Sequence, residues 1–198
     1  MNVNRKKNYN LILGGGLTGV IMLFILIGIF YTPYDPDAMN AADKFAGVSI
    51  RHLMGCDNFG RDVFSRVLEG SRTTWLVAAG TVFIGTFFGV ILGALTGYYG
   101  GIVDEILMRV NDAVFAFPSI LLALTFISIS GSGRYQVVIA LGIAFIPSFA
   151  RIVRGEFIKC KNMDYVKNAR LQGAGDFRIM FVHILPNTLT VLLSAVMI

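Results

Sequence analysis

Residues 73–103 read TTWLVAAGTVFIGTFFGVILGALTGYYGGIV and contain no charged side chain. About 20 apolar residues in helical form cross the hydrocarbon core of a bilayer, so this stretch is long enough to span it. Glycine recurs at every fourth position, at Gly85, Gly89, Gly93 and Gly97. A helix places these glycines on one face, where a second backbone can approach closely. The stretch therefore predicts a membrane helix buried among others, whether in simple packing or beside a translocation path.

The rest of the chain has the same character. Hydrophobic residues make up 55% of its 198 residues and charged residues only 15%, whereas soluble domains carry about 25% charged residues. Further apolar stretches with widely spaced charges are residues 11–31, 113–133, 135–150 and 179–198. Together these stretches predict an all-α integral membrane protein, a polytopic helical bundle with four complete spans and part of a fifth.

The last stretch, residues 179–198, is still apolar at its final residue. Polar flanks or interfacial aromatic residues normally follow a complete span. We therefore expect the chain to be a fragment or a truncated product. The alternative is a short C-terminal segment that dips into the membrane.

The distribution of basic residues predicts the orientation. Arg5, Lys6 and Lys7 precede the first span, which places residues 1–10 in the cytoplasm by the positive-inside rule. The apolar run 11–31 is too long for a signal peptide, so we expect an uncleaved anchor helix. Alternation of the spans then puts residues 32–72 outside. It puts the strongly basic loop 151–178 inside, in agreement with the same rule.

The outer loop 32–72 ends in an amphipathic pattern. Val63 with Val67 and Phe64 with Leu68 lie four residues apart, and they share one side of a short predicted helix. On the other side we expect two ion pairs, which are Asp62 with Arg66 and Arg66 with Glu69.

Metal and nucleic-acid sites are not predicted. The two cysteines, Cys56 and Cys160, fall in loops on opposite sides of the membrane and cannot pair with each other. The cysteines and the two histidines show none of the usual zinc-ligand spacings. The basic residues flank the spans, as orientation signals do, so the net charge of +5 does not indicate nucleic-acid binding.

The inner loop contains a compact helical signal between Asp164 and Asp176. It reads as a short helix, a glycine stop and a new helix capped by Asp176. Val166, Ala169 and Gly173 share one face of the first helix. A small-residue helix in a basic loop is suited to docking into a groove on another protein. The alternative is a helix that lies on the membrane surface.

This segment resembles the cytoplasmic coupling motif of binding-protein-dependent ABC permeases, Glu-Ala-Ala-x-x-x-Gly followed by Ile-x-Leu-Pro. Ala169, Gly173, Leu185 and Pro186 match the motif. Lys167, Asn168 and His183 replace the Glu, the first Ala and the Ile. The resemblance implies that the following residues form a loop that couples to an ATPase: Asp164, Tyr165, Val166, Lys167, Asn168, Ala169, Arg170, Gly173, Ala174, Leu185 and Pro186.

Other segments resemble the second permease subunit of the dipeptide, oligopeptide and nickel importers. Gly55 to Arg66 is similar to its Gly-Thr-Asp-x-x-Gly-Arg-Asp-x-x-Ser-Arg motif, with Cys56 in place of Thr. Further matches lie in the expected order, at residues 97–101, Asp104, 108–109, Asp112, 117–118 and 150–156. The resemblance implies a type I ABC importer permease with six spans at full length, in which residues 73–198 form an incomplete transmembrane domain.

Such a subunit works in a larger assembly in the cell inner membrane. The resemblance implies a homologous second permease subunit, two ATP-binding cassette ATPase subunits and an extracytoplasmic solute-binding protein, surrounded by membrane lipid. The chain has no Gly-x-x-x-x-Gly-Lys-Ser/Thr loop, so we expect no catalytic site or cofactor on it, and ATP with Mg to be used by the separate ATPase. The expected cargo is a dipeptide or oligopeptide, with a nickel chelate as the alternative. Substrate-binding residues are not predicted.

Two other classes are weighed against this one. Proton- or sodium-coupled transporters usually carry ionisable groups in the midmembrane region. No acidic residue lies deep in any predicted span, which disfavours a secondary transporter or channel. A membrane enzyme or scaffold is also disfavoured, because no nucleophile, base and orienting group occur together. Pro118 and Pro147 lie within the third and fourth spans, where we expect bends.

Overall fold

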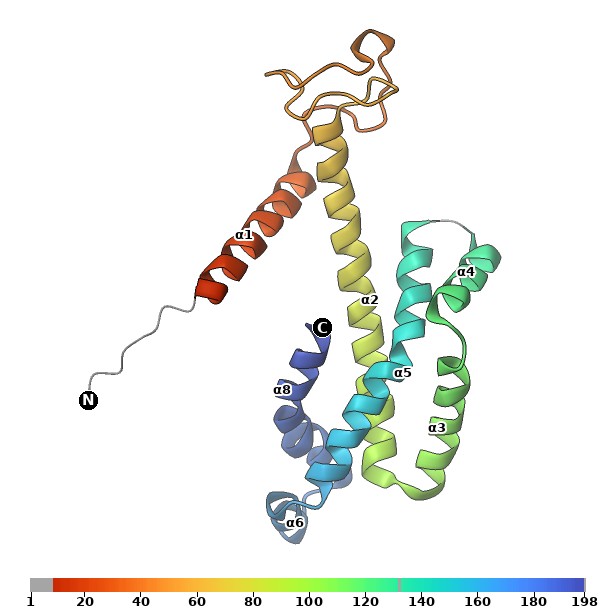
Figure 1. Ribbon diagram of the computed structural model, residues 1–198. Helices are drawn as coiled ribbons and strands as arrows, with labels where there is room; N and C mark the ends of the chain where they lie inside the picture. Colours follow the sequence, from red (N-terminus) through yellow and green to blue (C-terminus); the bar gives the residue numbers. More distant parts are fainter. Residues whose placement is uncertain (1–8, 132, 198) are drawn as a thin grey trace, which may run out of the picture. The chain divides into compact units, whose positions relative to one another are not determined.

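The computed structural model describes residues 9–131 and 133–197, in which the regular elements are helices and no strand occurs (Figure 1). The predicted all-α polytopic fold class is confirmed. The basic cluster on which the predicted orientation depends lies in residues 1–8, outside the described residues. The chain divides into two compact units, residues 1–76 and 77–198.

The N-terminal unit holds α1 (Tyr9–Phe30), a connecting loop of residues 31–62 with the short helix η1 (Ala41–Asp43), and the first turns of α2 (Val63–Tyr99). Gly28 lets α1 approach α2, because a Cβ atom there would lie 2.5 Å from the Leu68 carbonyl oxygen. The Leu68 side chain is fully buried. Close backbone approach at a small residue is a common way for membrane helices to pack.

The predicted amphipathic helix of the outer loop is not a separate element. Val63 begins a single helix of 37 residues that continues to Tyr99. Hydropathy marks where a helix becomes apolar, and here the helix begins several turns earlier.

The predicted ion pairs of this region are also wrong. Asp62 caps α2, because its carboxylate accepts hydrogen bonds from the Ser65 backbone N–H at 2.8 Å and the Ser65 hydroxyl at 2.7 Å. Arg66 donates instead to Asp57 at 2.6 Å, and Glu69 lies 3.8 Å from Arg72.

The C-terminal unit contains the end of α2 and the remaining helices. These are α3 (Gly101–Phe115), α4 (Ser119–Ser130), α5 (Arg134–Lys161), α6 (Asp164–Leu171), α7 (Asp176–Arg178), the π-helical turn η2 (Ile179–Ile184) and α8 (Leu185–Val196). Its core gathers Phe157 of α5, Val166 of α6, and Ile179, Met180 and Ile184 of η2.

The third predicted span, residues 113–133, is not one straight helix. The α3 and α4 helices meet at an angle of 84° across a short break that contains Pro118. Proline has no backbone N–H, and its ring disfavours helical geometry at the preceding residue. Pro118 therefore separates two helices, which is a larger effect than the predicted bend.

The fourth predicted span, residues 135–150, is part of a longer helix. The α5 helix continues through Pro147 to Lys161, so the first part of the predicted loop 151–178 is helical. Arg151 ended the predicted span, but in the structure Arg151 and Arg154 pair with acidic residues of α3 and do not interrupt the helix.

Helices that are long and apolar enough to cross a bilayer number four in the described residues: Ile12–Phe30, Val63–Tyr99, Arg134–Lys161 and Asp176–Val196. The bent pair α3 and α4 makes a fifth if the two helices form one span. All five correspond in order to the apolar stretches of the sequence.

Candidate functional site: the 151–186 segment and the helices that hold it

The glycine stripe of α2 lies against α5. A Cβ atom at Gly89 would lie 2.5 Å from the Phe149 Cβ, and one at Gly93 would lie 2.5 Å from the Ala150 carbonyl oxygen. The outer two glycines, Gly85 and Gly97, also contact α5, through Phe145, Phe149, Arg154 and Phe157. At Gly89, Gly93 and Gly97 only a hydrogen leaves room for the α5 backbone, whereas a Cβ at Gly85 would meet side-chain atoms of α5 at 3.1–3.2 Å. The two helices therefore meet along the whole stripe.

Two arginines of α5 also bind acidic residues of α3. The Arg154 guanidinium donates two hydrogen bonds to the Asp104 carboxylate, both at 2.6 Å. Arg151 donates to Asp112 at 3.0 Å and lies 4.3 Å above the Phe115 ring. A two-bonded arginine–carboxylate pair fixes both distance and orientation. The end of α5 that leads into α6 is thus attached to both α2 and α3.

The α6 helix, the predicted coupling helix, has two different faces. Val166 and Ala169 are buried, and Tyr165 packs partly buried against the core of the unit. Lys167, Asn168, Arg170 and Leu171 lie on the exposed side. Two of the three residues predicted to share the small-residue face, Val166 and Ala169, are therefore packed within this chain, and Gly173 is exposed. The opposite face of α6 is the exposed one.

Leu171 is a notable residue of that exposed face. Its side chain is 85% exposed, although leucine is apolar. Lys167 is also exposed, and its ammonium group lies 3.2 Å from the Asp164 carboxylate at the start of the helix.

The glycine stop after α6 is a Schellman motif. The Ala174 N–H donates to the Ala169 carbonyl and the Gly173 N–H to the Arg170 carbonyl, both at 3.0 Å. Gly173 has a φ of +83°, which favours glycine, and a Cβ there would contact nothing within 4 Å. Gly173 is therefore required for the turn, not for close packing.

The sequence predicted that Asp176 caps the next helix, and this prediction is wrong. Gly175 is the N-cap, and Asp176 is the first residue of α7. Its carboxylate is used elsewhere, because it accepts a hydrogen bond of 2.5 Å from the Tyr98 hydroxyl.

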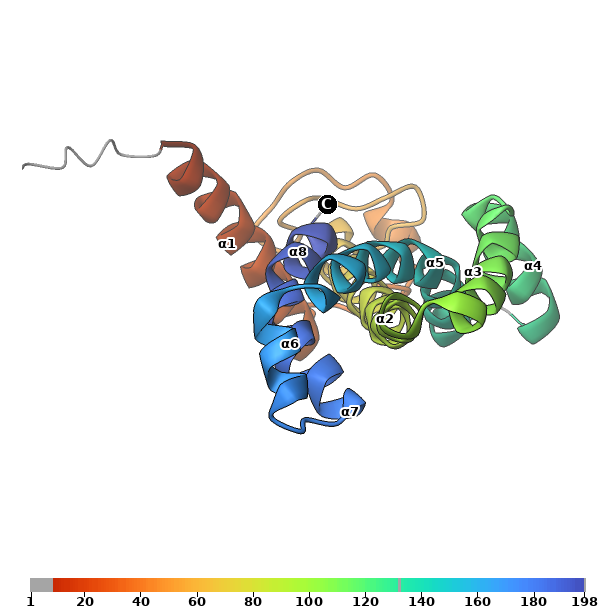
Figure 2. The same cartoon turned by 90° about the horizontal axis from the view of Figure 1, so that it is seen from below.

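Tyr98, at the end of α2, joins both sides of the α6–α7 turn. Its buried hydroxyl donates to Asp176 and accepts a hydrogen bond of 2.7 Å from Arg170. Arg170 also lies 3.5 Å from Asp176, so the three side chains form a closed triangle. Figures 1 and 2 show α6 and α7 at the end of the unit where α2 meets α3. The triangle thus links the exposed loop directly to α2.

The chain returns to the core through a π-helical turn, η2. Its wide turn ends at Ile184, immediately before Leu185 and Pro186 begin α8. Proline at this position cannot donate a backbone hydrogen bond and crowds the preceding turn. Local π-helical adjustments can re-satisfy the backbone groups that a proline leaves without partners in a membrane helix. Leu185 packs partly buried on the core, and Pro186 is exposed.

An apolar groove of about 620 Å³ lies between α2, η2 and α8. It is lined by hydrocarbon side chains such as Phe83, Phe87 and Phe181, with Thr86 as a polar member. Charged peptide termini would lose their hydration there without gaining partners. The groove is thus suited to an apolar helix or an acyl chain more than to a peptide.

Residues 89–198 match the family described as the binding-protein-dependent transport system inner membrane component. The chain belongs to this family. It is a family of ABC importer permeases. The chain is a multi-pass inner-membrane protein of this class.

Among its relatives is the glutathione transport system permease protein GsiD of Pectobacterium atrosepticum, 41% identical over 177 residues. That match covers 87% of this chain and 59% of the relative. The same protein of Escherichia coli is 41% identical over 174 residues, which cover 86% of this chain and 57% of the relative. The chain thus spans somewhat more than half the length of these permeases.

Among the connections that sequence reasoning missed in this permease are two between residues far apart in the chain. It noted Tyr98, Asp104 and Arg154 only as parts of family motifs, without the pairs that they form. Residues 50 or more positions apart in a helical protein give no periodic signal of contact. The available signal was the presence of charged residues at the ends of apolar helices, where each needs a partner.

Replacing Tyr98 with phenylalanine tests the link between α2 and the α6–α7 turn. The ring still fills its buried position, but Asp176 and Arg170 lose their shared hydroxyl. We expect the free energy of unfolding to fall by about 1–2 kcal/mol, and amide hydrogen exchange in residues 164–178 to rise. Tyr99→Phe is the matched control, because the Tyr99 side chain is exposed. Equal exchange in the two variants would contradict the link.

Proposed function

We propose that the chain is the membrane-spanning permease part of an ATP-driven, binding-protein-dependent importer. The observation that supports this most directly is the α6 segment. It is a short helix whose inner face is fixed to the transmembrane core and whose outer face, with Leu171 85% exposed, is open to a partner. Family membership supports the same function.

In this proposal a separate ATPase subunit binds the outer face of α6. Closure of two ATPase subunits on ATP and Mg would push α6, and the push would pass to α2 through Tyr98 and to α5 through the buried Val166 and Ala169. The chain would work beside a homologous permease subunit and receive its cargo from an extracytoplasmic binding protein. Its N-terminus and residues 151–178 would then lie in the cytoplasm.

We propose a peptide as the cargo. The relatives named above are described as glutathione permeases, and glutathione is a peptide-like molecule. A nickel chelate is the alternative cargo within the same mechanism.

The test is ATP hydrolysis by the complete reconstituted complex. The binding protein is added empty, loaded with glutathione, loaded with other short peptides, or loaded with a nickel chelate. We expect stimulation by a peptide-loaded form. Stimulation by nickel alone would keep the mechanism and change the cargo, and failure of any ATPase to associate would overturn the proposal.

A substitution on α6 tests the contact surface. Leu171→Asp places a charge on the exposed face without disturbing the core. Loss of a central apolar contact costs roughly 1–2 kcal/mol, so we expect ATPase binding to weaken about 10-fold. Ile50→Asp is the control, since Ile50 is 98% exposed in the connecting loop. Unchanged ATPase affinity in Leu171→Asp would place the contact elsewhere.

A further inference from the structure

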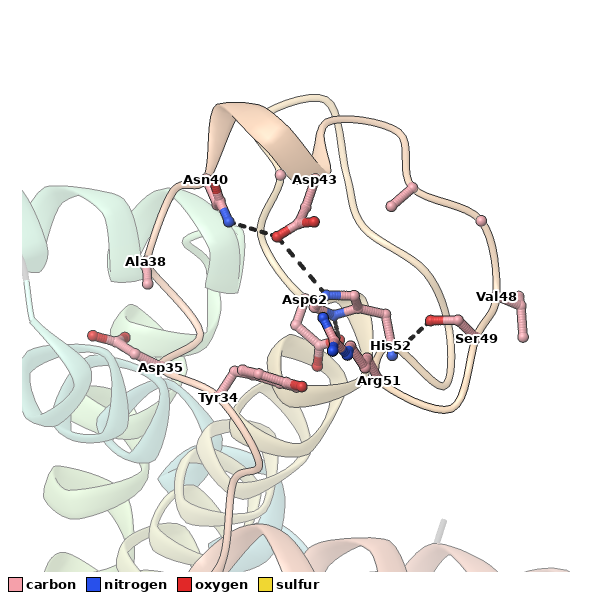
Figure 3. A pocket seen from close by; sticks show the side chains of 13 residues that line it. Tyr34, Asp35, Ala38, Asn40, Asp43, Val48, Ser49, Arg51, His52 and Asp62 are labelled. Carbon is pink, nitrogen blue, oxygen red and sulfur yellow. Dashed lines mark hydrogen bonds and ion pairs between the residues drawn. The ribbon is translucent and has the colours of Figure 1, made fainter.

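The connecting loop brings three potential metal ligands together. His52, Cys56 and Asp62 offer a nitrogen, a sulfur and an oxygen that all lie within 4.8 Å of one another. The His52 Nδ1 is 2.9 Å from the Asp62 Oδ1 (Figure 3). Cys56 and Asp62 pair across a short antiparallel bridge. Sequence spacing predicted no metal site, because this set follows no usual zinc pattern and forms only when the loop folds back.

The neighbouring groups orient this set toward one point. Ser65 binds the Asp62 Oδ2 through its backbone N–H and its hydroxyl, at 2.8 and 2.7 Å, which leaves Oδ1 directed at His52. On the other side of the imidazole, Nε2 lies 4.0 Å from the Asp43 carboxylate. A carboxylate behind a metal-binding histidine is the usual outer partner, because it fixes the ring and its tautomer.

The charges of the loop also favour a cation. A divalent cation binds cysteine as the thiolate and releases its proton. One thiolate, one carboxylate and one neutral imidazole give two negative charges, which balance a divalent ion.

The nearby Asp57 is not part of this set. Burial acts to raise its pKa, but hydrogen bonds from the Arg61 N–H and guanidinium and from the Phe59 N–H hold the pKa well below its usual value. Arg66 also binds it at 2.6 Å. This carboxylate is therefore ionised and already neutralised by two arginines.

We propose that His52 Nδ1, Cys56 Sγ and Asp62 Oδ1 bind a zinc-class divalent cation. Nitrogen and sulfur donors select zinc over magnesium or calcium. Tetrahedral zinc requires donors about 3.3–3.6 Å apart, so the His52–Asp62 hydrogen bond opens slightly as the ion replaces its proton. A pocket of about 700 Å³, lined by His52, Asp62 and Asp43, gives water access to the fourth position (Figure 3).

The test uses the full chain, purified in detergent and titrated with Co²⁺ as a spectroscopic substitute for zinc. We expect one Co²⁺ per chain, tetrahedral absorption bands and a thiolate-to-cobalt charge-transfer band, all lost on addition of Zn²⁺. Cys56→Ser, a nearly isosteric change, is expected to abolish the charge-transfer band. Cys160→Ser is the matched control, because Cys160 is the other free and buried cysteine and lies in α5.

A second variant separates a built site from a lone reactive thiol. Asp43→Asn leaves all three ligands in place but weakens the partner behind His52. We expect it to keep the charge-transfer band and to lower zinc affinity about 10–100-fold. An identical cobalt spectrum in Cys56→Ser, or no zinc binding by the unchanged chain, would overturn the proposal. Because ATPase and transport play no part in these measurements, their outcome is independent of the proposed function.

Discussion

Replacing Gly93 with alanine is expected to lower the free energy of unfolding by about 1–3 kcal/mol, the usual cost of overpacking. A Cβ atom at this position would lie 2.5 Å from the Ala150 carbonyl oxygen and 2.9 Å from the Arg154 backbone nitrogen. Neither backbone atom can move away as the end of a side chain could. The α2 and α5 helices would have to separate along the glycine stripe.

Gly70→Ala is the matched control for this prediction. Gly70 lies in the same helix, and a Cβ there would contact nothing within 4 Å. Alanine is the better helix former by about 1 kcal/mol, so the same chemical change is expected to be neutral or stabilising there. Thermal and SDS-induced unfolding in detergent measure both variants. A decrease of the same size in both would show that the stripe is not a packing surface.

Breaking the Asp104–Arg154 pair is expected to have the second large effect. Both hydrogen bonds are 2.6 Å long, and the two side chains are only 19% and 32% exposed. Removal of one partner leaves the other charge poorly solvated, so we expect Arg154→Ala or Asp104→Ala to cost about 2 kcal/mol or more. A double-mutant cycle is expected to give a coupling free energy of about 1–3 kcal/mol.

A second ion pair, which lies entirely on α3 and is exposed, serves as the comparison. Glu105 and Arg109 lie 3.8 Å apart, with side chains 70% and 81% exposed. An exposed pair at this spacing contributes only about 0.3–0.5 kcal/mol. A coupling free energy for Asp104–Arg154 as small as that of Glu105–Arg109 would mean that the pair does not hold α3 to α5.

The order and approximate number of membrane helices followed from composition. Long charge-free stretches must be helical in lipid, because the backbone groups have no other partners there. The ends of the helices were less predictable. Val63 and Lys161 bound helices that continue well past their apolar parts, where hydropathy gives no signal. Pro118 was a visible breaking point, but only the structure gave the angle of 84°.

The predicted coupling segment, too, could be predicted from the sequence only in part. Local sequence predicted the α6 helix and its glycine stop, because helix termini depend on short-range backbone hydrogen bonds such as those at Gly173. It could not predict which face would be free. Val166 is buried because η2, more than ten residues later, packs against it in the same core.

What the sequence by itself determined about this protein is its class: a helical membrane protein of the ABC importer permease type. Periodicity, charge spacing and short motifs are local properties, so they can be recognised in the sequence alone. Only the tertiary structure decided which distant groups meet, as Tyr98 does with Asp176 and His52 does with Cys56 and Asp62. Such contacts depend on the paths of the helices and loops through space, and separation along the chain does not encode them.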